Sequence, residues 1–69
     1  MSEIKAVILE NNENGDTRTV EADFIHVSEK NLYTLGRFDR DQNKCVYQYF
    51  NTYKFSVIDI KYKEENENN

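Results

Sequence analysis

A chain of 69 residues forms one small domain and cannot bury a large core. A single cysteine and a single histidine exclude an internal disulfide and a structural zinc site. The net charge is −4, but residues 1–62 carry ten acids against eight bases, so the body is only mildly acidic. That balance argues against a protein whose affinity depends mainly on the neutralisation of phosphates. A chain this small is stabilised by a well-packed barrel, by homo-oligomerisation or by both.

The sequence also indicates where the protein resides. The N-terminal residues lack the apolar region of a signal peptide, and no apolar run approaches the roughly 18 residues of a membrane span. A lone thiol fits a reducing compartment. We therefore expect a soluble, cytoplasmic protein with no membrane partner.

The first two predicted strands form a hairpin. Residues 4–9 are apolar on both faces, as in a strand that lies inside a sheet or against a second layer. Asn14-Gly15 is a strong hairpin signal, because both residues adopt positive φ at little cost. A long second strand is predicted over residues 17–27.

The second strand changes phase along its length. Its apolar positions lie on one face up to Phe24 and on the other from Ile25 onward, which leaves His26 facing outward. A slip of one residue requires a bulge or a sharp bend. A long bent strand that serves two sheets is what a small closed barrel needs.

The third strand is predicted over residues 32–38, and a polar hairpin tip follows over residues 39–43. Gly36 lies inside this strand and indicates a kink or a close approach of another chain segment.

The fourth and fifth strands are predicted over residues 44–50 and 53–62, on either side of a tight corner. The fifth strand changes phase after Val57, where apolar residues move to positions 58, 60 and 62. Two phase changes in two long strands favour a curled sheet over a flat one.

These elements predict a single all-β domain over residues 1–62. Five strands with short turns predict a small barrel or a sandwich, and the strong bending of this antiparallel sheet favours closure into a barrel. Residues 63–69 hold three glutamates and no apolar residue, and we expect them to form a disordered acidic tail.

The strand order resembles that of the SH3-like and Sm-like small barrels: a hairpin, a long bent second strand, a third strand, a short polar tip, a fourth strand and a tight corner before the last strand. The resemblance covers residues 4–62 and implies a fold, not an activity. Sm-like proteins usually have a glycine in the bent second strand, where this chain has Ala22 and Asp23. Their nucleic-acid-binding residues have no clear counterpart here, so the resemblance assigns none.

One stretch opens like a calcium-binding loop but does not complete it. Asp39, Asp41 and Asn43 have the right spacing. The loop then requires a glycine and a bidentate glutamate, where this chain has Lys44 and Phe50. We expect a solvated hairpin tip and no metal site.

The sequence offers no catalytic arrangement. His26 and Ser28 are two residues apart on one strand, and no third group completes a triad, so we expect a surface histidine. Cys45 lies next to Lys44, but that lysine points to the opposite face, so we expect a buried or half-buried structural cysteine. The predicted protein is not an enzyme and needs no cofactor.

The tyrosines are the best candidates for a binding surface. Tyr47 and Tyr49 share one face of the fourth strand, Tyr53 follows the corner, and Tyr33 lies on the third strand. Tyrosine rings stack on bases, nucleotides and protein partners alike. The same rings also suit a small core or an oligomer seam. With the nearby cations included, the predicted partner- or ligand-binding residues are Tyr33, Arg37, Lys44, Tyr47, Tyr49, Tyr53 and Lys54.

We expect a non-catalytic binding module: a homo-oligomeric accessory protein, of the kind found in phages and mobile elements, that inhibits or tethers a protein partner. The first alternative is a protein that sequesters a nucleotide-type ligand with tyrosines at subunit seams. The second is an Sm-like binder of RNA or single-stranded nucleic acid, whose affinity would fall steeply with salt.

Overall fold

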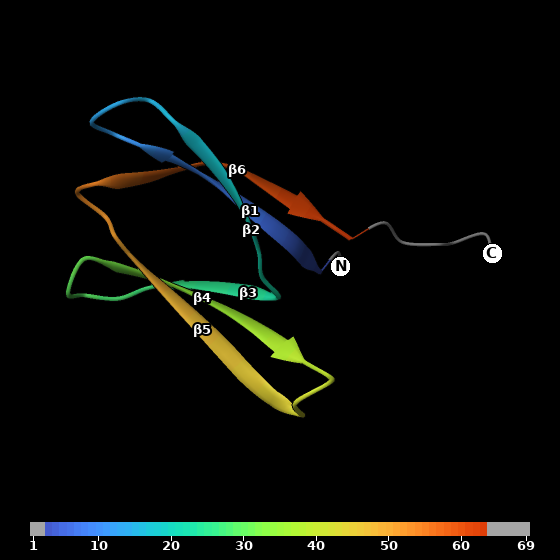
Figure 1. Ribbon diagram of the computed structural model, residues 1–69. Coiled ribbons are helices and arrows are strands. Elements are labelled where there is room, and N and C mark those ends of the chain that lie inside the picture. Colours follow the sequence, from blue (N-terminus) through green and yellow to red (C-terminus); the bar gives the residue numbers. More distant parts are fainter. Residues whose placement is uncertain (1–2, 64–69) are drawn as a thin grey trace.

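The computed structural model describes residues 3–63 and folds them into six antiparallel strands (Figure 1). The strands are β1 (Ile4–Asn11), β2 (Thr17–Glu21), β3 (Phe24–Val27), β4 (Leu32–Asp39), β5 (Lys44–Asn51) and β6 (Phe55–Tyr62). They form two three-stranded sheets, in the orders β2-β1-β6 and β3-β4-β5. The all-β prediction is confirmed. The tail predicted to be disordered lies outside the described residues, apart from Lys63.

The predicted second strand is two strands, which is why residues 3–63 form six strands and not five. Ala22 and Asp23 lie between β2 and β3, and the backbone N–H of each donates a hydrogen bond to a different sheet. The Ala22 N–H donates to the Lys5 carbonyl at 3.1 Å in the first sheet, and the Asp23 N–H donates to the Gly36 carbonyl at 2.6 Å in the second. The phase change therefore comes before Phe24, not after it.

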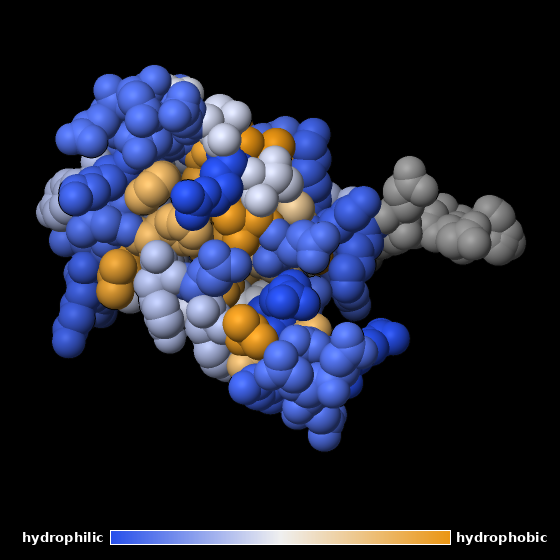
Figure 2. Space-filling view, in the orientation of Figure 1, coloured by the Kyte–Doolittle hydropathy of each residue, from blue (hydrophilic) through white to orange (hydrophobic). Residues whose placement is uncertain are grey.

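The two sheets face each other without closing into a barrel. Among residues 3–63, strand pairing stays within each sheet, and no closed barrel is detected. Figure 2 shows the consequence: apolar side chains come to the surface in the middle of this view, between the two sheets of Figure 1, with hydrophilic side chains around them. No helix in the described part of the chain could cross a membrane.

The last strand returns to the first, so β1 is the central strand of its sheet. The pairing of β1 with β6 shifts by one residue where Ile8 faces Asp59 and Leu9 faces Val57. Ile58 is therefore left unpaired in a bulge with half of its surface exposed. This bulge lies where the sequence predicted the second phase change.

The core lies between the sheets and receives side chains from both. Its buried members are Val7, Leu9, Val20, Ala22, Leu35 and Phe50. The Phe50 ring makes an edge contact with Phe55, at 5.2 Å between ring centres, and the Arg18 guanidinium lies 5.8 Å from the Phe50 ring centre. Phe50 therefore joins the second sheet to β6 and β2 of the first.

Candidate functional site

The outer face of the second sheet carries a group of exposed aromatic side chains, which we call the aromatic face. Its members are Phe24, Phe38, Tyr47 and Tyr49, which are 42%, 46%, 48% and 61% exposed. The pairing of β3, β4 and β5 brings them together, because residues opposite each other in an antiparallel sheet point to the same side. Soluble monomers rarely expose contiguous apolar patches without a functional reason.

Gly36 shapes the centre of the aromatic face. It lies between Phe24 and Tyr47 in a row across the three strands. The Phe24 ring lies over Gly36 so closely that a Cβ atom there would overlap it. The same ring makes an edge contact with Tyr47, at 6.2 Å between ring centres and 71° between ring planes. The missing side chain thus lets Phe24 lie across the sheet and meet Tyr47.

The aromatic face holds no aspartate or glutamate within residues 3–63, and its one histidine, His26, lies opposite Thr34. The electrostatic influence of the neighbouring Cys45 and a hydrogen bond with its side chain raise the pKa of Tyr47 above the ordinary value of 10.0. The Tyr47 hydroxyl is therefore neutral at physiological pH. None of the paired positions on this face holds a lysine or an arginine within residues 3–63. Such a surface suits an uncharged or apolar partner surface better than a phosphate backbone.

The structure divides the predicted binding residues among three places. Tyr47 and Tyr49 share the aromatic face, as the alternation along the fourth strand predicted. Tyr33 points to the other side of the sheet, opposite Phe50, and packs against the core. Arg37 and Lys44 also occupy positions on that other side.

Tyr53 and Lys54 lie in the corner between β5 and β6. The Tyr53 hydroxyl accepts a hydrogen bond from the Asn31 side chain at 3.1 Å, and its carbonyl accepts one from the Asn12 side chain at 3.0 Å. Tyr53 therefore helps to fix the corner against two other turns.

Two members of the aromatic face were missed by the sequence analysis. Phe24 was placed on the same face as Val20 and Ala22, which are buried, because the break at Ala22 and Asp23 was not recognised. Phe38 was treated only as an apolar position of its strand. A signal for the face existed in Gly36, since an isolated strand glycine often marks a site that another group approaches closely.

The other sequence candidates have structural explanations. The prediction that Cys45 is buried or half-buried is wrong: it is exposed on the aromatic face, opposite Phe38. The Asp39 carboxylate accepts hydrogen bonds from the backbone N–H groups of Asp41 and Gln42, at 3.0 and 3.3 Å, and so shapes the hairpin tip. The Ser28 hydroxyl similarly accepts from the Lys30 N–H at 3.1 Å. Within residues 3–63, no group of acids, cysteines and histidines is arranged to hold a metal ion.

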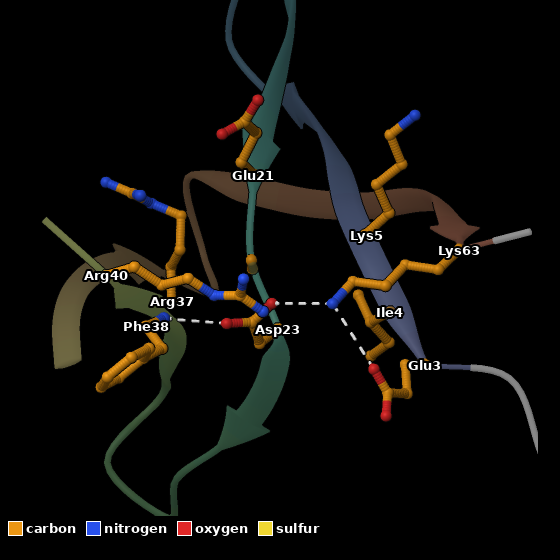
Figure 3. Close-up of a pocket in the computed structure, with 10 residues that line it drawn as sticks. Glu3, Ile4, Lys5, Glu21, Asp23, Arg37, Phe38, Arg40 and Lys63 are labelled. Carbon is orange, nitrogen blue, oxygen red and sulfur yellow. Dashed lines mark hydrogen bonds and ion pairs between the residues drawn. The ribbon is translucent and has the colours of Figure 1, made fainter. Parts of the chain in front are cut away.

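A second feature is a hollow of about 780 Å³, which we call the end hollow because Glu3 and Lys63, the first and last described residues, line it (Figure 3). Its charged lining comes from both sheets and from the break between β2 and β3; it consists of Glu3, Lys5, Glu21, Asp23, Arg37, Arg40 and Lys63. Ile4, Ala22 and Phe38 supply its apolar part. Phe38 thus borders both the end hollow and the aromatic face.

Asp23 organises the end hollow. Its Oδ2 accepts a hydrogen bond from the Phe38 N–H at 2.8 Å, and its Oδ1 lies 3.5 Å from the Lys63 Nζ. Lys63 also reaches Glu3 at 3.4 Å, and Figure 3 shows it between the two acids. The Phe38 hydrogen bond, with smaller contributions from Lys63 and Arg37, lowers the pKa of Asp23 below its ordinary 3.8 against the opposing effect of burial.

Three of the four cations that line the end hollow, Lys5, Arg37 and Arg40, are not paired in this way within residues 3–63. Neither Arg37 nor Arg40 forms an ion pair with another residue in the range 3–63, whereas Lys63 has two acidic neighbours. Two guanidinium groups beside an apolar surface can hold a carboxylate or a phosphate.

No family model, no curated protein and no solved structure matches this chain. Its function is therefore argued from the geometry of the aromatic face and the end hollow.

Proposed function

We propose that this protein is a non-catalytic binding module that holds a protein partner against the aromatic face and thereby inhibits or tethers it. The observation that carries this proposal is the exposure of four aromatic rings on one sheet face that has no lysine, arginine or acid within residues 3–63, with Phe24 lying over Gly36 in edge contact with Tyr47. Exposed tyrosine and phenylalanine are enriched in protein interfaces, where they supply much of the binding energy. We propose that the module acts in the cytoplasm as a homo-oligomeric accessory protein of phage or mobile-element type.

We further propose that the two sheets are the halves of an SH3-like or Sm-like small barrel. Two features support this: β2 and β3 pass the chain from one sheet to the other at Ala22 and Asp23, and β6 returns to pair with β1. In that description, the aromatic face is the outside of the half formed by β3, β4 and β5.

The partner-binding proposal is tested by capture from a host lysate with matched variants and quantitative mass spectrometry. Tyr49→Ala should release the partner that the wild-type protein retains, with affinity reduced roughly 30-fold for a loss of about 2 kcal/mol at an interface centre. Tyr62→Ala is the control, because Tyr62 is similarly exposed but belongs to the first sheet. Melting curves of both variants verify that they fold. If the Tyr49→Ala and Tyr47→Ala variants each retain the partner as well as the wild-type protein does, the proposal is contradicted.

The end hollow favours a second candidate, a nucleotide-type ligand. Its volume suits a small molecule, and Arg37 and Arg40 are available within the described residues to bind a phosphate beside the apolar ring of Phe38. The test is native mass spectrometry of freshly purified protein, together with melting curves in the presence of nucleotides. A ligand at 100 times its dissociation constant should stabilise the fold by about 2.7 kcal/mol. The combined variant Arg37→Gln, Arg40→Gln should remove this gain, and Lys44→Gln, Lys54→Gln should not.

A nucleic-acid partner has less support. The three cations predicted to lie near the tyrosines do not share their face: Arg37 lines the end hollow, Lys44 starts β5 on the other side of the sheet, and Lys54 lies in the corner. A single-strand binder combines stacking rings with cations along one groove.

A further inference from the structure

The four sheet edges of the described structure differ in how well they are protected. β2 and β3 are short, with five and four residues. β6 has the bulge at Ile58 and the charges of Asp59 and Lys61. Short length, bulges and charges are the usual means by which proteins prevent edge strands from pairing with other chains.

β5 has none of these protections in its central part. It pairs with β4 over eight consecutive residues without a register shift. From Cys45 to Asn51 it carries no charge, no proline and no glycine. Figure 1 shows β5 at the margin of its sheet, and β4 is its only partner strand among residues 3–63. A long, regular, uncharged edge is a template for another strand.

The hydrogen-bonding direction along β5 follows from the turn between β3 and β4. The Ser28 N–H donates to the Leu32 carbonyl at 2.9 Å, so the backbone groups of Leu32 face β3. Because the direction of the backbone N–H and C=O groups alternates along a strand, those of Leu35 face β5 and form hydrogen bonds with its register partner Gln48. The backbone N–H and C=O groups of Cys45, Tyr47 and Tyr49 therefore point to the free edge.

We propose that β5 of a second copy of this chain pairs with this edge in antiparallel orientation, about a two-fold axis at Gln48. This inference deepens the proposed homo-oligomer by naming its interface, and it rests on that proposal for the oligomeric state. The two-fold axis places Gln48 opposite Gln48 of the partner subunit and Tyr47 opposite Tyr49 of the partner subunit. Two three-stranded sheets then become one six-stranded sheet.

The second copy fits this edge for reasons of charge and of shape. When a strand pairs with the same strand of a second copy, any charged residues near the two-fold axis lie close to identical charges. Like charges opposite each other destabilise a sheet. The seven residues centred on Gln48 carry none, and Lys44 lies beyond them. The pairing also places both aromatic faces on the same side of the sheet, so the partner subunit's Tyr49 extends the row that contains Tyr47. An interface of this kind supplies burial that a 69-residue chain lacks alone.

Sedimentation velocity over a range of protein concentrations tests the pairing with a charge exchange at its centre. Gln48→Glu and Gln48→Lys each place like charges opposite each other, so each variant alone should dimerise several-fold more weakly than the wild type. An equimolar mixture of the two should form heterodimers at least as readily as the wild type forms homodimers. Gln42→Glu and Gln42→Lys are the matched controls, because Gln42 lies in the hairpin tip outside the pairing, and they should dimerise normally.

The mixture also serves as the folding control, because a misfolded variant cannot regain association. Dimerisation of both Gln48 variants at the wild-type level, or a mixture no tighter than its components, overturns the two-fold pairing but leaves the homo-oligomer proposal in place. A wild-type protein that stays monomeric at every concentration overturns both. Neither result bears on the capture of a protein partner, which the Tyr49→Ala experiment tests separately.

Discussion

At the residue scale, Gly36 has the largest effect on the candidate binding surface, although it has no side chain. It lets the Phe24 ring lie across the sheet and reach the edge of Tyr47. The ring is itself 42% exposed, so it can be displaced without moving the backbone. Gly36 therefore controls the shape of the aromatic face more than it controls the core.

Gly36→Ala should lower the free energy of unfolding by about 1 kcal/mol, because the new methyl group displaces the Phe24 ring. In a Phe24→Ala background, the same substitution should stabilise the protein by roughly 0.5–1 kcal/mol, since alanine suits a strand better than glycine. Urea denaturation of the four proteins measures both effects. An equal cost of Gly36→Ala in both backgrounds would show that the ring does not occupy this position.

Asp23 should make the stability of the protein depend on pH in the acid range. Its pKa in the folded state is below the ordinary 3.8, so the unfolded state binds the proton first as the pH falls. Its stabilising contribution is complete above the ordinary value and is lost as the pH falls through the folded-state pKa. Urea denaturation from about pH 5 to about pH 2 should therefore show a weaker pH dependence for Asp23→Asn than for the wild type. Glu13→Gln, at an exposed turn position, is the control and should retain the wild-type dependence.

At the element scale, the bulge in β6 decides which of its apolar residues face the core. Val57 lies opposite the fully buried Leu9 and packs against the core, whereas Ile58 lies in the bulge and is half exposed. The sequence predicted this change of face, because the alternation of apolar and polar residues along the fifth strand breaks after Val57. The other break was harder to predict: Ala22 and Asp23 continue the alternation of β2, but the Asp23 N–H leaves the first sheet and donates to the Gly36 carbonyl of the second.

Val57→Thr and Ile58→Thr form a matched pair that tests the bulge. A hydroxyl group brought next to Leu9 should cost about 1 kcal/mol of unfolding free energy. The same change at Ile58 should remain within about 0.5 kcal/mol, because the side chain already meets solvent. Thermal or urea denaturation measures the loss of unfolding free energy for each variant. A larger loss for Ile58→Thr than for Val57→Thr would place the register shift elsewhere in β6.

At the scale of the whole molecule, the sequence was enough to predict the all-β class, the hairpin at Gly15 and the alternation that puts Tyr47 and Tyr49 on one face. The aromatic face as a unit was not predictable, because it depends on the registers of β3, β4 and β5. Cross-strand register places Phe24, Gly36 and Tyr47 in one row, and residues so far apart carry no local signal of their neighbours. The end hollow likewise requires both sheets to be placed before Arg37 and Lys63 come near each other.

The return of β6 to β1 also has a consequence for synthesis on the ribosome. The sheet of β3, β4 and β5 is continuous in sequence, so its hairpins can form as soon as residues 24–51 have emerged. The other sheet pairs Ile4 with Tyr62, so its central strand β1 gains its second partner only after β6 has emerged. During translation, the aromatic face and the open edge of β5 can therefore form before Phe55 emerges to pack against Phe50. The nascent chain exposes the surface proposed for binding earlier than it completes its core, at the stage when premature association is most harmful.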